Sequence, residues 1–353
     1  MQAIVYHDNK DLRLEDIPEP VAGPGEVKLR ITGTSICATD IEEWQYGPLW
    51  VQHGSPNAMT GKQTPLVLGH ETAGTVYELG EGVDNVAVGD RVAINTVLTC
   101  GTCFWCMRGQ QAVCPNMAVA GFMADGGLAE FMVWPAEKLV PMPDTISDAE
   151  GPLLEPATVA VHGVRRSGVR PGDNVAIVGC GTVGLLTVQA FKAAGARVIA
   201  LDVREQSLTL AKELGADEVL SSLDESAASA KLLELTGGIG PDIVVETAGA
   251  NETPRMAIEW TRRGGTTLLL GIYSTTPEIN FNNVVGPEIT VIGSVATSPG
   301  DLEAAVELVG SGKINVKPLI SEIVPLSRAM EDGFERMLDP NKDIYRIVIQ
   351  PGS

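Results

Sequence analysis

Residues 174–184, NVAIVGCGTVG, give the clearest indication of the fold. Asn174–Val178 is an apolar run of strand length that ends in a glycine-rich turn, and Thr182–Ala194 continues with helical spacing. Asp202 follows eighteen residues after the last glycine of the turn, at the end of the next expected strand. A G-x-G-x-x-G motif that lies between a strand and a helix, with an acidic residue at this distance, is the context that dinucleotide binding requires.

The turn therefore predicts a site for a dinucleotide. Its glycines permit close approach of the backbone to a pyrophosphate, and the N–H groups at the start of the helix attract the phosphates. A glycine turn without a ligand is the structural alternative. Asp202 can accept hydrogen bonds from ribose hydroxyls and would repel a 2′-phosphate, which predicts NAD rather than NADP, while Arg204 favours NADP more weakly. The predicted cofactor-binding residues are Gly179, Gly181, Thr182, Val183, Gly184, Asp202 and Arg204.

Strand and helix patterns alternate beyond this turn. A helix is expected over Arg204–Leu214, and the expected strands are Arg197–Leu201, Ile243–Val245, Thr267–Leu270 and Ile289–Ile292. Such alternation predicts a parallel sheet covered on both faces. The first 150 residues instead contain short β-branched runs separated by Gly and Pro turns, which predicts a β-rich domain. The expected strands there are Glu26–Ile31, Leu66–Leu68, Arg91–Ile94 and Glu130–Val133, and a helix is expected later at Leu302–Val309.

Length and charge limit the class of protein. The 353 residues suggest about two domains. The formal net charge of −20 makes nucleic acid and anionic membranes poor partners. The N-terminus lacks the pattern of a secretion signal, and no apolar run is long enough to span a bilayer. We therefore expect a cytoplasmic protein.

Four of the six cysteines are crowded into residues 100–114. Their spacing is C-x2-C-x2-C-x7-C, and a closed set of four thiolates is the usual ligand set of structural zinc. The intervening loop is too short to form a core, so metal binding would supply its fold. An iron–sulfur cluster and four unrelated buried thiols remain as alternatives. The predicted ligands are Cys100, Cys103, Cys106 and Cys114.

A second metal site is suggested by Cys37, His70 and Glu155. One thiolate, one imidazole and one carboxylate can hold zinc with a fourth position open. These residues lie far apart in the chain, and a buried Cys or His more often serves only in core packing. The sequence positions alone therefore do not show that these three residues form one metal site.

The motifs together resemble the zinc-dependent medium-chain dehydrogenases of the alcohol dehydrogenase superfamily. The resemblance rests on Gly69-His70-Glu71, Gly74, Gly80 and Val83, on the Cys37 segment and the four-cysteine loop, and on Glu155-Pro156 and the glycine turn. The stretches GPLLEPATVAVHG and GPLW…TGKQTPLVLGHE look most like the 2,3-butanediol and sorbitol dehydrogenases.

This resemblance implies an α/β protein with a GroES-like catalytic domain (1–152 and 297–353) and a Rossmann NAD-binding domain, a doubly wound parallel sheet (153–296). It implies two zinc ions per chain, with Cys37, His70 and Glu155 at the catalytic zinc. Glu71 would be a fourth ligand or would lie just behind the metal. Asp40 would orient His70, and Thr39 would take the substrate proton. A homodimer or homotetramer is also implied, with Ile289–Ile292 as a candidate strand at the interface.

The expected reaction is hydride transfer between NAD and a secondary alcohol, diol or polyol. A 2,3-butanediol-like substrate is favoured, and sorbitol, L-iditol or L-threonine is the alternative. A non-catalytic binding protein of the same fold would need a lost ligand or a broken turn, and neither is found. Candidates for lining the substrate pocket are Trp44, Tyr46, Trp50 and His53, although such side chains as often serve in packing.

One position departs from the family pattern. The family usually has a histidine five residues after the catalytic-site cysteine, where this chain has Glu42. We expect Glu42 to pass the proton toward solvent if burial or the neighbouring Glu43 raises its pKa. Glu42 and Glu43 as a solvated acidic pair is the structural alternative, and His53 is a second candidate for the relay.

Overall fold

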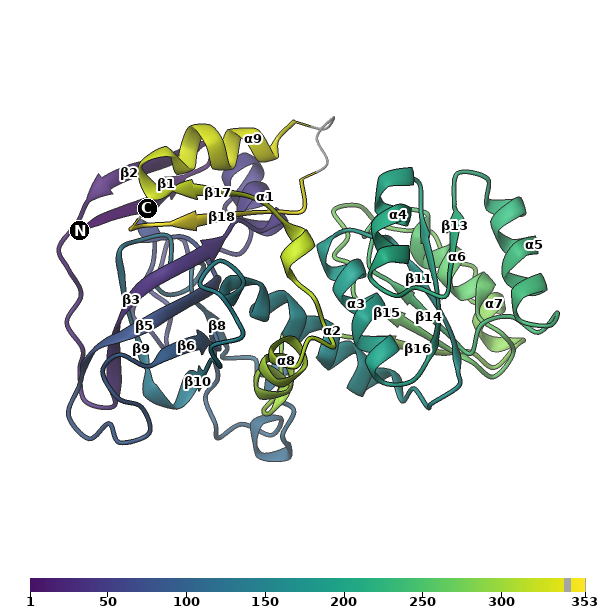
Figure 1. Ribbon diagram of the computed structural model, residues 1–353, viewed down its shortest axis with the longest axis horizontal. Helices are drawn as coiled ribbons and strands as arrows, with labels where there is room; N and C mark the ends of the chain where they lie inside the picture. The colour runs from purple at the N-terminus through teal and green to yellow at the C-terminus, as the bar shows by residue number, and fades with distance from the viewer. Residues whose placement is uncertain (340–343, 353) are drawn as a thin grey trace. The chain divides into compact units, whose positions relative to one another are not determined.

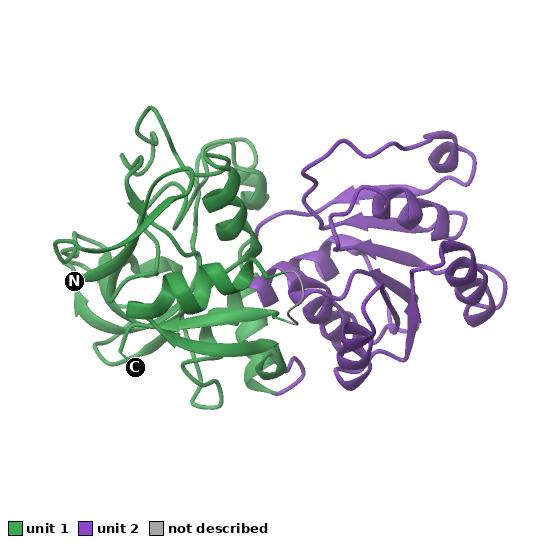
Figure 2. Ribbon diagram, turned by 90° about the horizontal axis from the view of Figure 1, so that it is seen from above, with its two compact units in different colours: residues 1–155, 297–311, 316–353 green, residues 156–296, 312–315 purple. Residues whose placement is uncertain are grey.

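The computed structural model describes residues 1–339 and 344–352, which fold into two compact units (Figure 2). Unit 1 comprises residues 1–155, 297–311 and 316–353, and unit 2 comprises residues 156–296 and 312–315. Residues 312–315 were expected in the first unit. They pack in the second because the Gln189 side chain pairs with both backbone groups of Asn315, at 2.6 and 3.2 Å.

Unit 1 is built on a mainly antiparallel sheet with the strand order β10-β6-β5-β3-β18-β17, and β9 also pairs with β3. A three-stranded sheet, β2-β1-β4, and the short pair β7-β8 accompany it. The strands are β1 (Gln2–Asp8), β2 (Asp11–Asp16), β3 (Glu26–Ser35), β4 (Leu66–Val67), β5 (Glu71–Leu79), β6 (Arg91–Ile94), β7 (Val97–Leu98), β8 (Ala118–Val119), β9 (Phe131–Pro135), β10 (Leu139–Pro141), β17 (Ile320–Pro325) and β18 (Arg346–Gln350).

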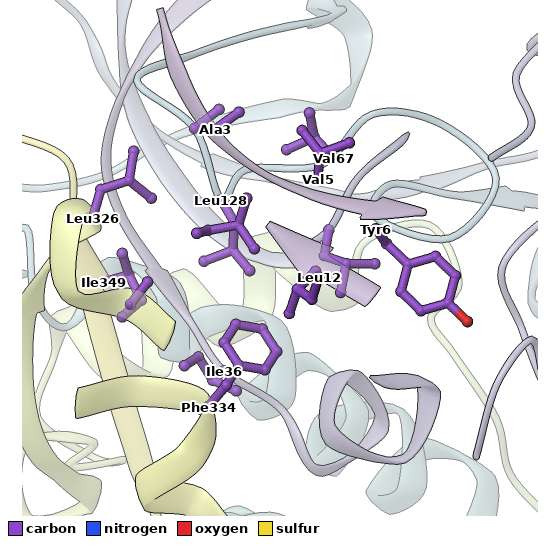
Figure 3. Close-up of a cluster of buried hydrophobic side chains, with 14 of the residues drawn as sticks. Ala3, Val5, Tyr6, Leu12, Ile36, Val67, Leu128, Leu326, Phe334 and Ile349 are labelled. Carbon is purple, nitrogen blue, oxygen red and sulfur yellow. The ribbon is translucent and has the colours of Figure 1, made fainter. Parts of the chain in front are cut away.

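The two ends of the chain form one structure in this unit. The C-terminal strand β18 lies between β3 and β17, as Figure 1 shows. Side chains from both ends also share one core: Tyr6 and Ile36 belong to the same buried cluster as Phe334 and Ile349 (Figure 3). The helices of the unit are α1 (Ala38–Tyr46), α8 (Asp301–Gly310) and α9 (Glu335–Met337), with a π-helical turn at Ala329–Phe334. The helix α2 (Leu154–Ser167) begins here and continues into unit 2.

Unit 2 contains a six-stranded, all-parallel sheet with the order β13-β12-β11-β14-β15-β16. The chain starts at the centre with β11, builds one half outward, and returns to build the other, which is the doubly wound topology. Its elements are β11 (Asn174–Val178), α3 (Thr182–Ala193), β12 (Arg197–Asp202), α4 (Glu205–Glu213), β13 (Glu218–Ser221), α5 (Glu225–Leu235), β14 (Ile243–Glu246), α6 (Thr253–Trp260), β15 (Thr266–Leu269), α7 (Asn282–Val285) and β16 (Thr290–Gly293).

The predicted fold class is confirmed, and the strands expected in unit 2 agree with the structure to within one residue at each end. The sequence patterns did not reveal β13, α5 and α6. Strand β13 is an edge strand with no fully buried residue, so it lacks the apolar run that marks β11. Among the residues described, no helix is both long and apolar enough to cross a membrane.

Candidate active site and metal centres

The pairing of β3 with β5 brings Cys37 and His70 together. Ser35 lies opposite Glu71 in this pair, so the residues just beyond the strand ends become neighbours. Cys37 caps the N-terminus of α1, and His70 follows Gly69, whose φ of +96° and close contacts leave no room for a side chain. The potential ligand atoms of Cys37, His70 and Glu71 all lie within 4.8 Å of one another. A thiolate, an imidazole and a carboxylate are the donors that zinc prefers, so this cluster fits a zinc ion.

Asp40 and Thr39 complete the surroundings of His70. Asp40 Oδ1 lies 3.4 Å from His70 Nδ1, which turns the other ring nitrogen, Nε2, toward Thr39 Oγ1 at 3.5 Å. Asp40 is fully buried, and its second oxygen accepts the Cys37 backbone N–H at 2.9 Å. Burial opposes protonation of His70, but the nearby charge of Asp40 outweighs it and raises the pKa of the imidazole well above its usual value. The Phe122 ring packs against the imidazole at 4.8 Å.

Glu71 is held by Arg346, which the sequence patterns did not identify. Arg346 Nε and Nη2 donate to the two carboxylate oxygens at 2.8 and 2.7 Å, and Ser35 Oγ also donates to Glu71. Arg346 Nη2 lies 3.5 Å from Cys37 Sγ as well. Burial alone would raise the pKa of Glu71, but the Arg346 charge keeps it below its usual value. The available signal was a lone arginine at the start of the apolar strand β18.

Glu155 lies outside the 4.8 Å group formed by Cys37, His70 and Glu71. Glu155 lies in the first turn of α2, and its carboxylate is within electrostatic range of His70, Glu71 and Arg346. Burial raises the pKa of Glu155 to about 7; His70 and Arg346 lower it, and Glu71 adds to the rise. A neighbouring cation would favour the ionised form. Its role as a zinc ligand therefore stays a prediction.

The four cysteines of residues 100–114 converge as expected. Their sulfur atoms all lie within 4.8 Å of one another, and none is in a disulfide. The sulfur of Cys114 lies 3.5 Å from that of Cys100 and 3.9 Å from that of Cys103. A tetrahedral ion with metal–sulfur bonds of about 2.3 Å places its sulfurs about 3.8 Å apart. These separations fit one ion and are too small for a multi-iron cluster, in which the cysteines bind different metal atoms.

The glycine turn is shaped for close approach of a ligand. Gly179 has a φ of +98°, and a side-chain carbon on Gly184 would lie 1.9 Å from the Gly179 oxygen. A carbon added to Gly181 would meet no atom within 4 Å, so the space above that residue is open. This open space at the N-terminus of α3 fits a pyrophosphate, and Thr182 and Val183 form the first turn of the same helix.

Asp202 supports the turn from the end of β12. Its two oxygens accept the backbone N–H groups of Cys180 and Arg204, at 2.6 and 2.8 Å. The Arg204 side chain lies beside the same carboxylate, with Nε at 3.4 Å. Asp202 and Arg204, the two residues predicted to lie near the ribose, are therefore next to the turn, at the carboxyl ends of the parallel strands.

The candidate relay residues Glu42 and His53 have different surroundings, and the relay itself stays a prediction. Glu42 is exposed on α1, and partial shielding by the protein raises the pKa of its carboxylate. Glu43 is not part of a solvated pair, because it is fully buried and accepts the N–H groups of Leu49, Trp50 and Val51. His53 is exposed, and its Nδ1 lies 3.1 Å from Thr64 Oγ1.

The aromatic residues suggested for the substrate pocket also differ in their surroundings. Trp44 packs edge-on against Phe334 with ring centres 5.8 Å apart, so its ring serves in packing. Tyr46 and Trp50 are exposed, at 75% and 43%. The Gln52 N–H donates to the Phe122 oxygen, which brings the loop that carries Trp50 near the ring that packs against His70.

Comparison with known proteins agrees with this geometry. Residues 23–144 match the alcohol dehydrogenase GroES-like domain, and residues 182–311 match the zinc-binding dehydrogenase family. The (R,R)-butanediol dehydrogenase of Bacillus subtilis is 33% identical over 99% of this chain and 100% of its own length. Human sorbitol dehydrogenase is 34% identical, over 93% of this chain and 90% of its own length.

A crystal structure of 2R,3R-butanediol dehydrogenase from Bacillus subtilis has a TM-score of 0.92 to this chain, with 32% identity and 99% coverage of both chains. The similarity thus covers both units and the sequence between them. The chain therefore belongs to the zinc-dependent alcohol dehydrogenase family, in its butanediol and polyol dehydrogenase branch, and is an oxidoreductase.

Proposed function

We propose that the enzyme oxidises a secondary alcohol group of a small diol or polyol to a ketone, with NAD as the hydride acceptor. The observation that carries this proposal is the cluster of Cys37, His70 and Glu71, with the Thr39 hydroxyl beside the imidazole. The favoured substrate is a 2,3-butanediol-like diol, because similarity to a butanediol dehydrogenase extends over nearly the whole chain.

Two zinc ions per chain are part of the proposal. Cys37, His70 and Glu155 would hold the catalytic ion, and the four cysteines of residues 100–114 would hold a structural one. A catalytic zinc ion supplies a Lewis acid that lowers the pKa of a hydroxyl group. We propose that Glu71 lies just behind this ion rather than serving as a fourth ligand, because Arg346 and Ser35 already donate hydrogen bonds to its oxygens.

The side chains around the cluster would position and deprotonate the substrate. Thr39 Oγ1 would accept the hydroxyl proton and pass it on, since a hydroxyl can accept one proton while donating another. Asp40 would keep Nδ1 of His70 as the protonated nitrogen and leave Nε2 free to act as a ligand. Arg346 would balance the negative charge that Cys37 and Glu71 bring into the buried site.

The second unit would hold the cofactor. The pyrophosphate would lie over Gly181 at the start of α3, and Asp202 would accept hydrogen bonds from the adenosine ribose. NAD supplies the chemistry of hydride acceptance, and the protein supplies its orientation. We further propose a reducing, cytoplasmic location, which the free cysteines favour, and a homodimer or homotetramer.

The proposal is tested with the purified full-length protein. We expect NADH to form with chiral 2,3-butanediols, at a kcat/KM above that for sorbitol, L-iditol or L-threonine. A preference for one of the latter would replace the substrate and keep the reaction. No NADH formation from any of these alcohols, by protein that contains two zinc ions per chain, would favour a non-catalytic binding protein.

A further inference from the structure

Glu246, at the end of β14, is a buried carboxylate that the proposed reaction does not use. It has no exposed surface. Its Oε1 accepts the N–H groups of Ala248 and Gly249, both at 2.8 Å, and the Thr253 hydroxyl at 2.7 Å. Its Oε2 accepts the Tyr273 hydroxyl at 2.5 Å. Burial of a charge is unfavourable unless hydrogen bonds replace water, so these donors together keep the carboxylate in place.

These hydrogen bonds join the loops after β14 and β15, which lie beyond the carboxyl ends of the parallel strands. The strand order of unit 2 reverses between β11 and β14, and doubly wound sheets bind ligands outside the carboxyl ends of the strands at such a reversal. The segment after β14 touches the glycine turn, because the Thr247 hydroxyl donates to the Gly179 oxygen at 2.8 Å. Ala248 also lies directly against Gly179.

The loop after β15 packs so closely against the loop after β14 that their backbones are in contact. A side-chain carbon on Gly271 would lie 2.4 Å from Glu246 Oε2 and 2.7 Å from the Gly249 nitrogen. A carbon on Gly249 would lie 2.5 Å from the Ile272 oxygen. This packing fixes the place of Ile272, a residue that is nevertheless 55% exposed. A large apolar side chain held in the open at a ligand-binding edge is available for an apolar ligand surface.

The position of this loop indicates which part of the cofactor it faces. Asp202 ends β12, on one side of β11, and serves the adenosine half in the proposed function. Glu246 ends β14, on the other side of β11. Because the pyrophosphate would lie at the turn between them, the nicotinamide half would extend toward the loops after β14 and β15.

We propose that Tyr273 is a positioning residue for the nicotinamide half of the dinucleotide: by donating to Glu246, it fixes the loop that presents Ile272. The proposal rests on the proposed function, because it assumes that unit 2 binds NAD. Removal of the Tyr273 hydroxyl would leave the buried Glu246 Oε2 without this donor and would release the loop after β15. The apparent affinity for the dinucleotide would then fall in proportion to the fraction of molecules whose loop is still in the binding conformation.

The test measures the dissociation constant of NADH by fluorescence titration of the full-length protein. We expect Tyr273→Phe to weaken NADH binding about tenfold, equivalent to about 1.4 kcal/mol. KM for NAD should rise, while KM for the diol at saturating NAD should not change. The control is Tyr6→Phe, which likewise removes a tyrosine hydroxyl near a buried carboxylate, Glu43, but in unit 1. This variant should bind NADH like the wild type, because its hydroxyl lies in the other unit and does not touch the loops after β14 and β15.

A double-variant cycle tests whether Tyr273 acts through Glu246. Glu246→Gln keeps the size of the side chain, and the effect of Tyr273→Phe on NADH affinity should be much smaller in that background. An unchanged NADH affinity in Tyr273→Phe, or an effect of equal size in both backgrounds, would overturn the inference while the proposed function stands. Failure of the wild-type protein to bind NADH would overturn both.

Discussion

Replacement of Arg346 tests the buried ion pair that the structure adds to the predicted site. Arg346→Met keeps most of the side-chain volume but removes both hydrogen bonds to Glu71, whose side chain is 1% exposed. Removal of one partner of a buried ion pair costs about 3–5 kcal/mol, because the remaining charge stays buried without compensation. For a unit of this size each kcal/mol lowers the melting temperature by about 2–4 °C, so a decrease of about 6–20 °C is expected.

The matched control is Arg13→Met. Arg13 forms a similarly short ion pair with Asp11, at 2.6 Å, but its side chain is 54% exposed. Water screens exposed pairs and their side chains are costly to order, so such pairs add little stability, and this variant should melt within a few degrees of the wild type. Differential scanning calorimetry of both variants, each with two zinc ions per chain, compares the two environments. Equal melting temperatures for the two variants would refute the argument that burial makes the Arg346–Glu71 pair indispensable.

Three further predictions concern metal, cofactor and proton transfer. Cys106→Ser should lose one zinc ion per chain and melt at a lower temperature, whereas Cys37→Ser should fold and lose turnover; elemental analysis that finds one zinc or none in active wild-type enzyme would contradict this. The wild type should show a higher kcat/KM with NAD than with NADP, and Asp202→Asn should narrow the difference because the charge that repels a 2′-phosphate is gone. If Glu42 accepts the proton, kcat/KM should rise with pH as its carboxyl ionises, at a pKa above the usual value. Glu42→Gln should remove this rise from the plot of kcat/KM against pH, and His53→Gln should not. If neither variant changes the pH dependence, the proton leaves through water alone.

The parts of the fold that the sequence predicted are those set by local patterns. Residues 174–202 contain an apolar strand, a glycine turn and a helix in immediate succession, and each is recognisable from its own residues. The four-cysteine loop is equally local. The pairing of β3 with β5, which joins Cys37 to His70, depends on contacts between distant segments, and only resemblance to a family indicated it.

Arg346 illustrates what local patterns cannot give. It lies 275 residues after Glu71, and it reaches the site because β18 is added to a sheet formed by the beginning of the chain. An arginine at the start of an apolar strand indicates a buried partner, but nothing in the strand says which carboxylate that partner is. The neighbouring pair Glu42 and Glu43 presents the converse case: identical side chains have opposite surroundings because only one of them meets the backbone of the loop that follows α1.

Carboxylates at the ends of helices and strands hold the irregular segments around both candidate sites. Glu43 binds the loop after α1, Asp202 binds the glycine turn, and Glu246 binds the loops after β14 and β15. A carboxylate suits this task because both oxygens only accept, and loop backbones offer unpaired N–H donors. An amide of the same size would direct an NH2 group at some of those donors. The need for acidic side chains at these points is therefore separate from the acidity of the surface, and a change of surface charge should leave the geometry of both sites intact.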